Sequence, residues 1–186
     1  MKRLAIALSK CVFSLVILLA VSACSTPQPK NIANVCEMYD EYYDWYLAAD
    51  GVEKRWGIPA HVTMAFIHQE SKFIDDARPP FEWFLWIIPT GRASSAYGYA
   101  QALDQTWDEY REQTNNWGAD RDEFEDAVDF IGWYNSKSLK RNRIGRHDAY
   151  SLYLAYHEGQ GGFSRGTYKN KKWLLTVARK VERMAK

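Results

Sequence analysis

Apolar and aromatic side chains recur at spacings of three and four residues along most of the chain, and this periodicity restricts the fold more than any other feature of the sequence. Side chains three and four residues apart share one face of an α-helix, so the spacing predicts a series of amphipathic helices. The first runs from residue 35 to 56 with a break near Gly51, and the second runs from Pro59 to about Lys72. Further helices are predicted for residues 104–112, 122–142, 148–157 and 171–184, with a glycine-rich break at 159–162. The predicted fold class is therefore mainly α.

Residues 76–99 lack this periodicity and contain Pro79, Pro80, Pro89 and Gly91. They predict a long loop or a small β region around the apolar run 81–88. Only one of these eight residues is charged, and a contiguous apolar patch of this kind is rarely left in water. We expect the run to fold over the domain or its groove as a packed flap. Contact with a partner or a membrane is the alternative.

Composition limits the size of the fold and the class of partner. The 186 residues, 47% of them hydrophobic, have room for one globular domain. The 24 Lys and Arg residues nearly balance the 23 Asp and Glu residues, which argues against a nucleic-acid partner. The histidines form no His-Glu-x-x-His pattern, and cysteines do not cluster, so we expect no metal and no other cofactor.

The N-terminal segment has the pattern of an export signal. Met1-Lys2-Arg3 is basic, residues 12–21 are apolar, and Val21-Ser22-Ala23-Cys24 follows, which is too short a run to span a membrane. Its end resembles the lipobox of bacterial lipoproteins, in which cleavage precedes a lipidated cysteine. The resemblance implies a signal peptide over residues 1–23, lipid on Cys24, and sorting to the outer membrane facing the periplasm, because Ser25 rather than Asp follows. An ordinary signal peptide with an incidental cysteine is the alternative.

The segment after the signal and the remaining cysteine complete the domain plan. Residues 24–33 are polar and proline-rich, which predicts a tether before a domain at 34–186. Because Cys11 lies in the signal and Cys24 would carry lipid, only Cys36 is left, and one thiol cannot form an internal disulfide. We expect Cys36 to be a small buried side chain on a helix.

A carboxylate lies at the inner edge of the predicted second helix. Glu70 follows Phe66 by four residues and Ile67 by three, which places it beside core side chains. Burial disfavours the charged form and raises the pKa of a carboxyl group, as a general acid near neutral pH requires. On periodicity alone, an outward position at the helix end is equally compatible with the sequence.

Four short motifs resemble those of the lytic transglycosylases with an SLT (soluble-transglycosylase, goose-lysozyme-like) domain, and they occur in the family's order. Glu70-Ser71 matches the Glu-Ser motif. Ala96-Tyr97-Gly98-Tyr99-Ala100-Gln101 is similar to Gly-Leu-Met-Gln, Ala155-Tyr156-His157-Glu158-Gly159-Gln160-Gly161 to Ala-Tyr-Asn-Ala-Gly-Pro-Gly, and Trp173-Leu174-Leu175-Thr176-Val177 to Tyr-Val-x-x-Val. His157 and Trp173 stand where the family has Asn and Tyr. The segment between Glu70 and Gly98 is longer than in compact members.

The resemblance implies a lysozyme-like helical domain that cleaves the β-1,4 bond between N-acetylmuramic acid and N-acetylglucosamine in peptidoglycan and leaves a 1,6-anhydro end. It implies that Glu70 is the single acid and base. Other residues would contact the glycan: Ser71, Gln101, Tyr156 and His157 along the groove, Trp173 beside Glu70, and Tyr97, Tyr99 and Trp86 against sugar faces. For each of those three aromatics, a place in the core is the alternative.

Other mechanisms and functions stay open at this point. Asp75 and Asp76 are nearby candidates for a second carboxylate, although an Asp pair after a helix is more often a turn or cap. A goose-type hydrolase would use Glu70 but deliver water. A non-catalytic lipoprotein would hold the glycan without cleaving it, and this rival is favoured mildly by His157 and Trp173 and opposed by the presence of Glu70.

Overall fold

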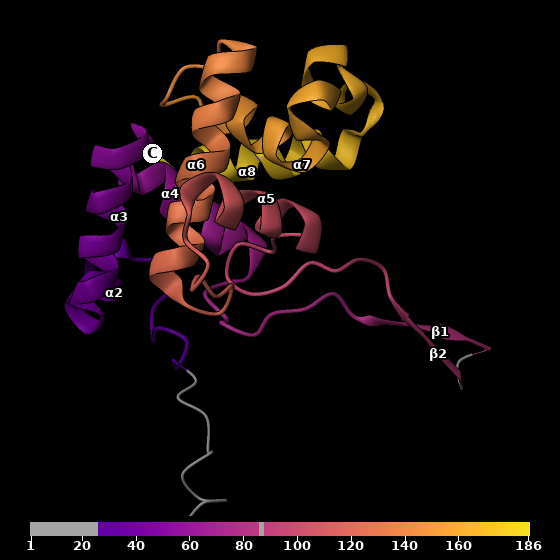
Figure 1. The fold of residues 1–186 in the computed structure, drawn as a ribbon, viewed down its shortest axis with the longest axis horizontal. Coiled ribbons are helices and arrows are strands. Elements are labelled where there is room, and N and C mark those ends of the chain that lie inside the picture. The colour runs from indigo at the N-terminus through magenta and orange to yellow at the C-terminus, as the bar shows by residue number, and fades with distance from the viewer. Residues whose placement is uncertain (1–25, 86–87) are drawn as a thin grey trace, which may run out of the picture.

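The computed structural model describes residues 26–85 and 88–186. Within these residues, seven α-helices and a two-stranded sheet form the fold (Figure 1). The helices are α2 (Val35–Glu41), α3 (Tyr43–Trp56), α4 (Ala60–Glu70), α5 (Asp104–Thr114), α6 (Phe124–Asn142), α7 (Ala149–Arg165) and α8 (Lys172–Met184). The antiparallel strands are β1 (Phe81–Phe84) and β2 (Ile88–Arg92), and a short 3-10 helix, η1 (Thr167–Asn170), precedes α8. The mainly helical class and the small β region are confirmed.

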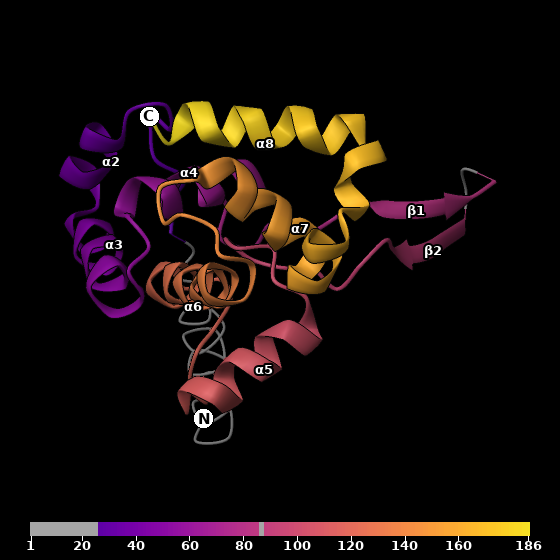
Figure 2. The same ribbon diagram turned by 90° about the horizontal axis from the view of Figure 1, so that it is seen from above.

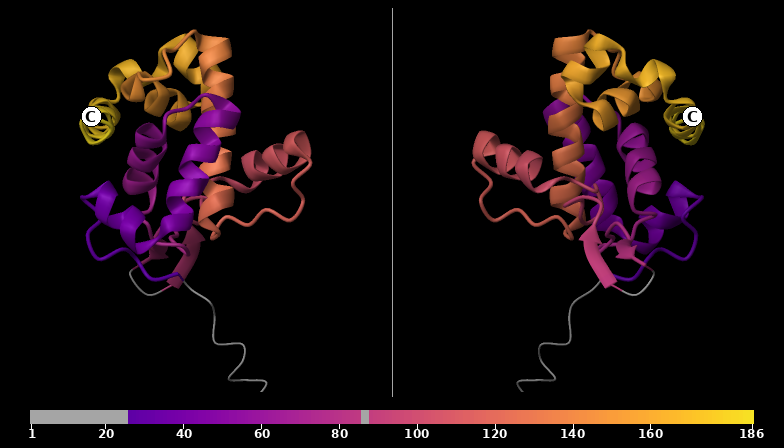
Figure 3. Two further views of the ribbon diagram at one scale, coloured as in Figure 1. Left: turned by 90° about the vertical axis from the view of Figure 1, so that its left-hand side faces the viewer. Right: turned by 90° about the vertical axis from the view of Figure 1, so that its right-hand side faces the viewer.

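The helices enclose α4, which is apolar on nearly every face. Its residues 62–67 are all buried, and it contacts α3, α6 and α8. Figure 2 shows α8 lying along α4 and α7, and Figure 3 shows α6 running through the height of the helical body. A helix that is hydrophobic all round belongs inside a protein. Glu70 is the last residue of α4, so its polar side chain lies at the edge of the core.

Aromatic rings connect α3, the start of α6 and the loop that carries Tyr99. Trp45 of α3 stacks on Phe124 at the start of α6, with ring centroids 3.9 Å apart. Tyr99 meets both rings edge-on, at 5.9 Å from Trp45 and 5.4 Å from Phe124. Stacked and edge-on pairs of this kind add to the free energy of area burial. The loop that carries Tyr99 is thus fixed to the core.

The first predicted helix is interrupted at Tyr42, so the predicted break near Gly51 is wrong. Tyr42 leaves the helical conformation (φ −131°, ψ 82°), donates its hydroxyl to the carbonyl of Pro27 at 2.8 Å, and stacks on Trp45. Gly51 continues α3, because a glycine within a helix costs only about 1 kcal/mol relative to alanine. The helix ends at Gly57, whose φ of 74° is accessible to glycine without strain.

The predicted helix end near His157 and the glycine break after it correspond to a kink inside α7, but a further helical segment after the kink, which runs to Arg165, was not predicted. Only Gly159 departs from helical geometry, with φ 72° and ψ 155°. Gly162 stays helical and meets its neighbours closely: a Cβ atom there would lie 3.1 Å from Glu158 Cβ and 3.1 Å from Thr167 Oγ1. One glycine therefore kinks the helix, and a second permits close packing.

The strands form a hairpin that projects away from the helices (Figures 1 and 2), so the expected packed flap is not what they form. Phe81 is 49% exposed and Leu85 is 65% exposed. The two strands satisfy each other's backbone hydrogen bonds, and the Arg92 guanidinium lies over the Phe81 ring at 4.2 Å. The contacts that hold the hairpin are therefore local to residues 81–92.

The described part of the predicted tether is packed on the domain. The Thr26 backbone N–H donates to Asp75 Oδ2 at 3.0 Å, and Pro29 is buried. Cys36 is exposed rather than buried, because α2 turns it outward from its buried residue Met38. The predicted signal peptide and Cys24 lie outside the described residues. No helix in the part of the chain that the structure describes is long and apolar enough to cross a membrane.

Candidate active site

Glu70 is the last residue of α4, and the chain turns sharply after it. The Ser71 backbone N–H caps the helix by donating to the Ile67 carbonyl at 3.0 Å. Lys72 and Phe73 then adopt left-handed conformations, with φ of 57° and 62°. Phe73 is fully buried against Trp45, and this anchor holds the turn. The helix therefore ends before the predicted Lys72, and Glu70 occupies its C-terminal end.

The environment of Glu70 favours a protonated carboxyl group. Desolvation by burial raises the pKa of Glu70 to about 7, although a hydrogen bond from Tyr153 and the nearby Lys72 ammonium favour the charged form. The partial negative charge at the end of α4 acts in the same direction as burial. A carboxyl group with such a pKa can give and retake a proton near neutral pH. The sequence allowed an inner or an outward position for Glu70, and the structure shows the inner one.

Two tyrosines of α7 surround this carboxyl group. Tyr153 hydrogen-bonds the Glu70 carboxyl group, and the charge of Glu70 adds to desolvation in raising the pKa of the partly buried Tyr156. Both rings meet Phe66 edge-on, at 5.4 and 5.3 Å. The motif analysis selected Tyr156 but missed Tyr153, although its spacing of three residues puts it on the same helix face.

The loop at residues 98–101 approaches Glu70 from the other side through Tyr156. The Tyr156 hydroxyl donates to the Ala100 carbonyl at 2.6 Å. Gln101, with φ 49°, donates its amide to the carbonyls of Ala77 at 2.8 Å and Gly98 at 2.9 Å. Gly98 has φ 75°, and a Cβ atom there would lie 2.0 Å from the Arg121 carbonyl oxygen. The loop therefore requires glycine at 98 for both conformation and space.

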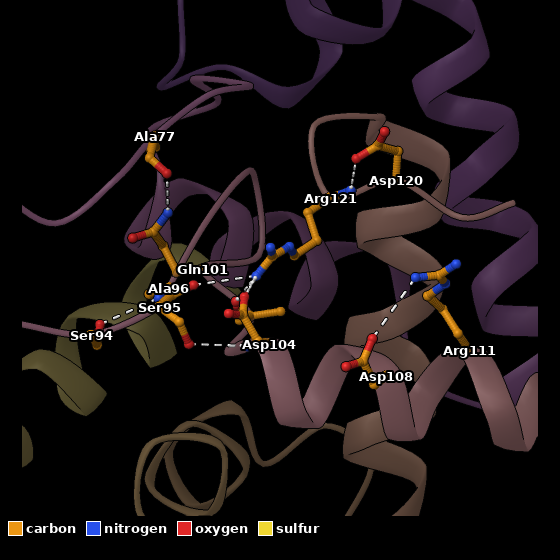
Figure 4. A network of polar contacts seen from close by, with 11 residues as sticks. Ala77, Ser94, Ser95, Ala96, Gln101, Asp104, Asp108, Arg111, Asp120 and Arg121 are labelled. Carbon is orange, nitrogen blue, oxygen red and sulfur yellow. Dashed lines mark hydrogen bonds and ion pairs between the residues drawn. The ribbon is translucent and has the colours of Figure 1, made fainter. Parts of the chain in front are cut away.

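Arg121 fixes the base of this loop (Figure 4). Its guanidinium donates to Asp104 Oδ1 at 2.7 Å and to the carbonyls of Ala102 at 3.1 Å and Ser95 at 3.2 Å. Its backbone carbonyl accepts the Tyr99 N–H at 3.1 Å. One side chain thus joins both ends of the loop to the start of α5, which keeps Gln101 in place.

A groove of about 310 Å³ lies between this loop and helices α6 and α7. The structure brings together Gln101, Tyr156 and His157, three of the residues selected from the motifs. They line the groove with Thr106, Tyr134 and Glu158. Aromatic faces beside amide and charged groups are suited to a sugar, which presents both apolar faces and hydroxyls.

Glu158 is a site residue that the motif analysis did not select. Its side chain is 4% exposed, and its Oε1 accepts from Lys171 at 2.6 Å and faces His157 Nδ1 at 3.0 Å, while Oε2 accepts from Thr167. Burial alone would raise the pKa of Glu158, but these hydrogen bonds outweigh burial and lower it to about 2. A carboxylate beside Nδ1 favours the tautomer that leaves Nε2 of His157 as an acceptor.

Four other predicted site residues lie elsewhere. Ser71 is buried and its hydroxyl donates to the Ile67 carbonyl. Tyr99 is fully buried in the core, so its ring has no free face for a sugar, and the core alternative is correct for it. The Tyr97 hydroxyl donates to Asp122, and the Arg78 guanidinium covers its ring at 4.0 Å. Trp173 is 56% exposed and meets His157 edge-on at 5.0 Å. Trp86 lies outside the described residues.

Of the two aspartates after α4, Asp75 bonds the backbone. Asp75 accepts the Thr26 N–H at 3.0 Å and the Asp76 N–H at 2.8 Å, one on each carboxylate oxygen. Asp76 is exposed. These contacts support a turn role for Asp75 rather than a role as a second catalytic carboxylate. Within the described ranges, no three His, Cys, Asp or Glu side chains gather as a metal site.

The site is a carboxyl group with a raised pKa at the end of a buried helix, two tyrosines around it, and a polar aromatic groove that shares Tyr156 with it, and this arrangement is suited to acid–base chemistry. Comparison with known protein families matches residues 12–186 to the transglycosylase SLT domain, and the chain belongs to this family. No curated protein matches the chain. Membership of this family indicates a peptidoglycan lytic transglycosylase. The resemblance of the four motifs predicted the same family.

Proposed function

We propose that this protein cleaves the β-1,4 bond between N-acetylmuramic acid and N-acetylglucosamine in peptidoglycan and releases a 1,6-anhydro-N-acetylmuramic acid end. The observation that carries the proposal is the half-buried position of Glu70 at the end of α4, where desolvation raises its pKa to about 7. A carboxyl group of this kind is protonated before the reaction and is a competent base after it.

Glu70 acts twice in this proposal. The protonated carboxyl group first gives its proton to the glycosidic oxygen, and the bond from that oxygen to C1 of the muramic sugar breaks. The C6 hydroxyl of the same sugar then bonds to C1, and the Glu70 carboxylate takes the hydroxyl proton. The proton lost in the first step is regained in the second, and no water is consumed. A substrate hydroxyl thus replaces the second carboxylate of most glycosidases.

The contacts of Asp75 support this mechanism over a hydrolase with two carboxylates. Both oxygens of Asp75 accept backbone N–H groups, and Asp76 is exposed. The presence of a half-buried, tyrosine-bonded acid argues against a domain that only holds glycan, since binding alone gives no reason to desolvate a carboxyl group.

The decisive measurement is product analysis. Full-length protein incubated with peptidoglycan sacculi should release muropeptides with the mass of the anhydro form, and Glu70→Gln should reduce turnover by about 10⁴-fold, the upper end for acid–base catalysis. Glu112→Gln, an exposed change on α5, is the matched control and should retain activity. Reducing ends would make the protein a hydrolase. Inactive wild-type protein that still binds sacculi would make it a binding lipoprotein.

We further propose that Cys24 carries lipid and that the protein is held at the outer membrane, facing the periplasm. The lipobox sequence and Ser25 support this placement. Cys24→Ala should leave the signal unprocessed or release the protein into the soluble fraction. A Cys24→Ala protein that migrates and fractionates like the wild type would contradict it.

A further inference from the structure

Two arginines from different helices converge over Gly161, two residues after Gly159 of the groove lining. Arg141 lies in the last turn of α6, and Arg165 is the last residue of α7. A Cβ atom added at Gly161 would lie 3.2 Å from Arg165 Nη1 and 3.7 Å from Arg141 Nη2. Both guanidinium groups thus reach the same small volume, which glycine leaves open.

Among the described residues, the two guanidinium groups converge without an acidic partner to balance their charge. In the described part of the chain, neither guanidinium forms a hydrogen bond or an ion pair, and both side chains are exposed. No Asp or Glu occurs between Asp129 and Asp148 or between Glu158 and Glu182. Glu109 and Glu158 already bind other cations, namely Lys137 at 2.5 Å and Lys171 at 2.6 Å. Two like charges held together without a counter-charge are stabilised by a bound anion.

The geometry selects a carboxylate-sized ligand. A guanidinium group presents parallel N–H donors that match the two oxygens of a carboxylate, and two guanidinium groups can bind one anion from two directions. The neighbouring backbone is rigid enough to hold them. The Asn142 amide donates to the Gln160 carbonyl at 3.1 Å and to Ser164 Oγ at 2.7 Å, which fastens the end of α6 to α7.

The pair is also at the right distance from the groove. Tyr134 lines the groove, and Arg141 follows it by seven residues, two turns further along the same face of α6, which is about 10 Å at the rise of an α-helix. Three residues of an extended peptide span about 10 Å. A peptide attached to a sugar in the groove would therefore bring its carboxylates to the two arginines.

We infer that Arg141 and Arg165 form a binding site for the carboxylates of the peptide stems of peptidoglycan. This inference rests on the proposed function and adds a substrate class to it, namely glycan strands that still carry peptides. The site would hold the stem while the sugar to which it is attached lies in the groove.

The test compares peptide-bearing sacculi with sacculi stripped of peptides by an amidase. Full-length Glu70→Gln protein is used for binding, so that substrate is not consumed. The added double change Arg141→Gln and Arg165→Gln should weaken retention on peptide-bearing sacculi by about tenfold or more, since charge-assisted hydrogen bonds are lost. Retention on stripped sacculi should stay within about twofold. The double change Arg179→Gln and Arg183→Gln on α8 removes the same charge from another exposed surface and should have no effect.

Three results would overturn the inference: equal loss on both kinds of sacculi, no loss on either, or an equal loss in the Arg179 and Arg183 control. Loss of binding to vesicles containing phosphatidylglycerol, with sacculus binding kept, would assign the pair to lipid phosphate and would also overturn it.

With Glu70 intact, the arginine variant should raise KM for peptide-bearing strands and keep kcat. If the wild-type protein cleaves no sacculi, the proposed function fails; if it cleaves both substrates and the arginine changes alter neither, only this inference fails.

Discussion

The hydroxyl of Tyr153 hydrogen-bonds the carboxyl group of Glu70, which joins the middle of α7 to the end of α4. The bond favours the charged form of Glu70, whereas burial favours the neutral form, and burial is the larger effect. The proton affinity of the candidate acid therefore depends on both helices.

The first prediction concerns the pH dependence of activity. Because the first step needs a protonated Glu70, kcat/KM should fall as pH rises through the Glu70 pKa of about 7. Tyr153→Phe removes a bond that favours the carboxylate, so the falling limb should move to higher pH, and the maximal rate should drop by up to about tenfold as orientation is lost. Tyr168→Phe in η1 is the control. If kcat/KM falls at the same pH in Tyr153→Phe as in the wild type, Tyr153 does not act on Glu70.

The second prediction concerns stability. The pKa of Glu70 is raised from 4.5 to about 7 in the folded protein, so the folded state binds the proton more tightly than the unfolded state. Below pH 4.5 both states are protonated and stability is unaffected; as pH rises towards 7, the free energy of unfolding falls by about 3 kcal/mol. Glu70→Gln cannot titrate, so it should be more stable than the wild type at pH 8 and similar at pH 4.5. Urea unfolding at the two pH values measures the difference, and equal differences at both would contradict the shift.

Helical periodicity was sufficient to predict most of the helices and the non-helical region at 76–99, because these follow from local side-chain spacing, whereas for Glu70 it left an inner and an outward position open. It did not reveal the break at Tyr42, which depends on a hydrogen bond to Pro27 and stacking on Trp45. A glycine is ambiguous for the same reason: Gly51 continues a helix, whereas Gly57 ends one. Tertiary contacts decide each case, and a local pattern does not contain them.

The candidate site was predictable where a motif residue has a side chain free to reach the groove. Gln101, Tyr156 and His157 are of this kind. Tyr99 sits beside them in sequence but is turned into the core by the left-handed residues around it, Gly98 and Gln101. Glu158 was missed because its importance comes from Lys171 and Thr167, which follow it by more than two helical turns. A pattern of residue types does not show which way a side chain turns.

The third prediction separates conformational strain from steric overlap with two glycines. Gly57 and Gly98 have similar φ values of 74° and 75°, but a Cβ atom at Gly57 would have no neighbour within 4 Å, whereas one at Gly98 would lie 2.0 Å from a carbonyl oxygen. Gly57→Ala should cost about 1 to 2 kcal/mol, the penalty of a left-handed alanine. Gly98→Ala should cost several kcal/mol more, since the Arg121 backbone must move. Denaturant unfolding of both variants measures the two losses of stability. Equal losses would mean that the loop at 98–101 moves away from the added Cβ atom at little cost in free energy.

The fourth prediction concerns the hairpin. Its strands contact each other and project from the helical body, with Phe81 and Leu85 exposed, so they should add little to the stability of the domain. Replacing residues 81–92 by a short Gly-Asn-Gly link should lower the melting temperature by no more than about 4 °C, the shift expected for about 1 kcal/mol in a domain of this size. Leu85→Ala should have no measurable effect, whereas Phe66→Ala, which removes a fully buried side chain, should cost about 3 to 5 kcal/mol. A loss of stability on hairpin removal comparable to that of Phe66→Ala would mean that the hairpin packs on the domain in solution, as a flap would.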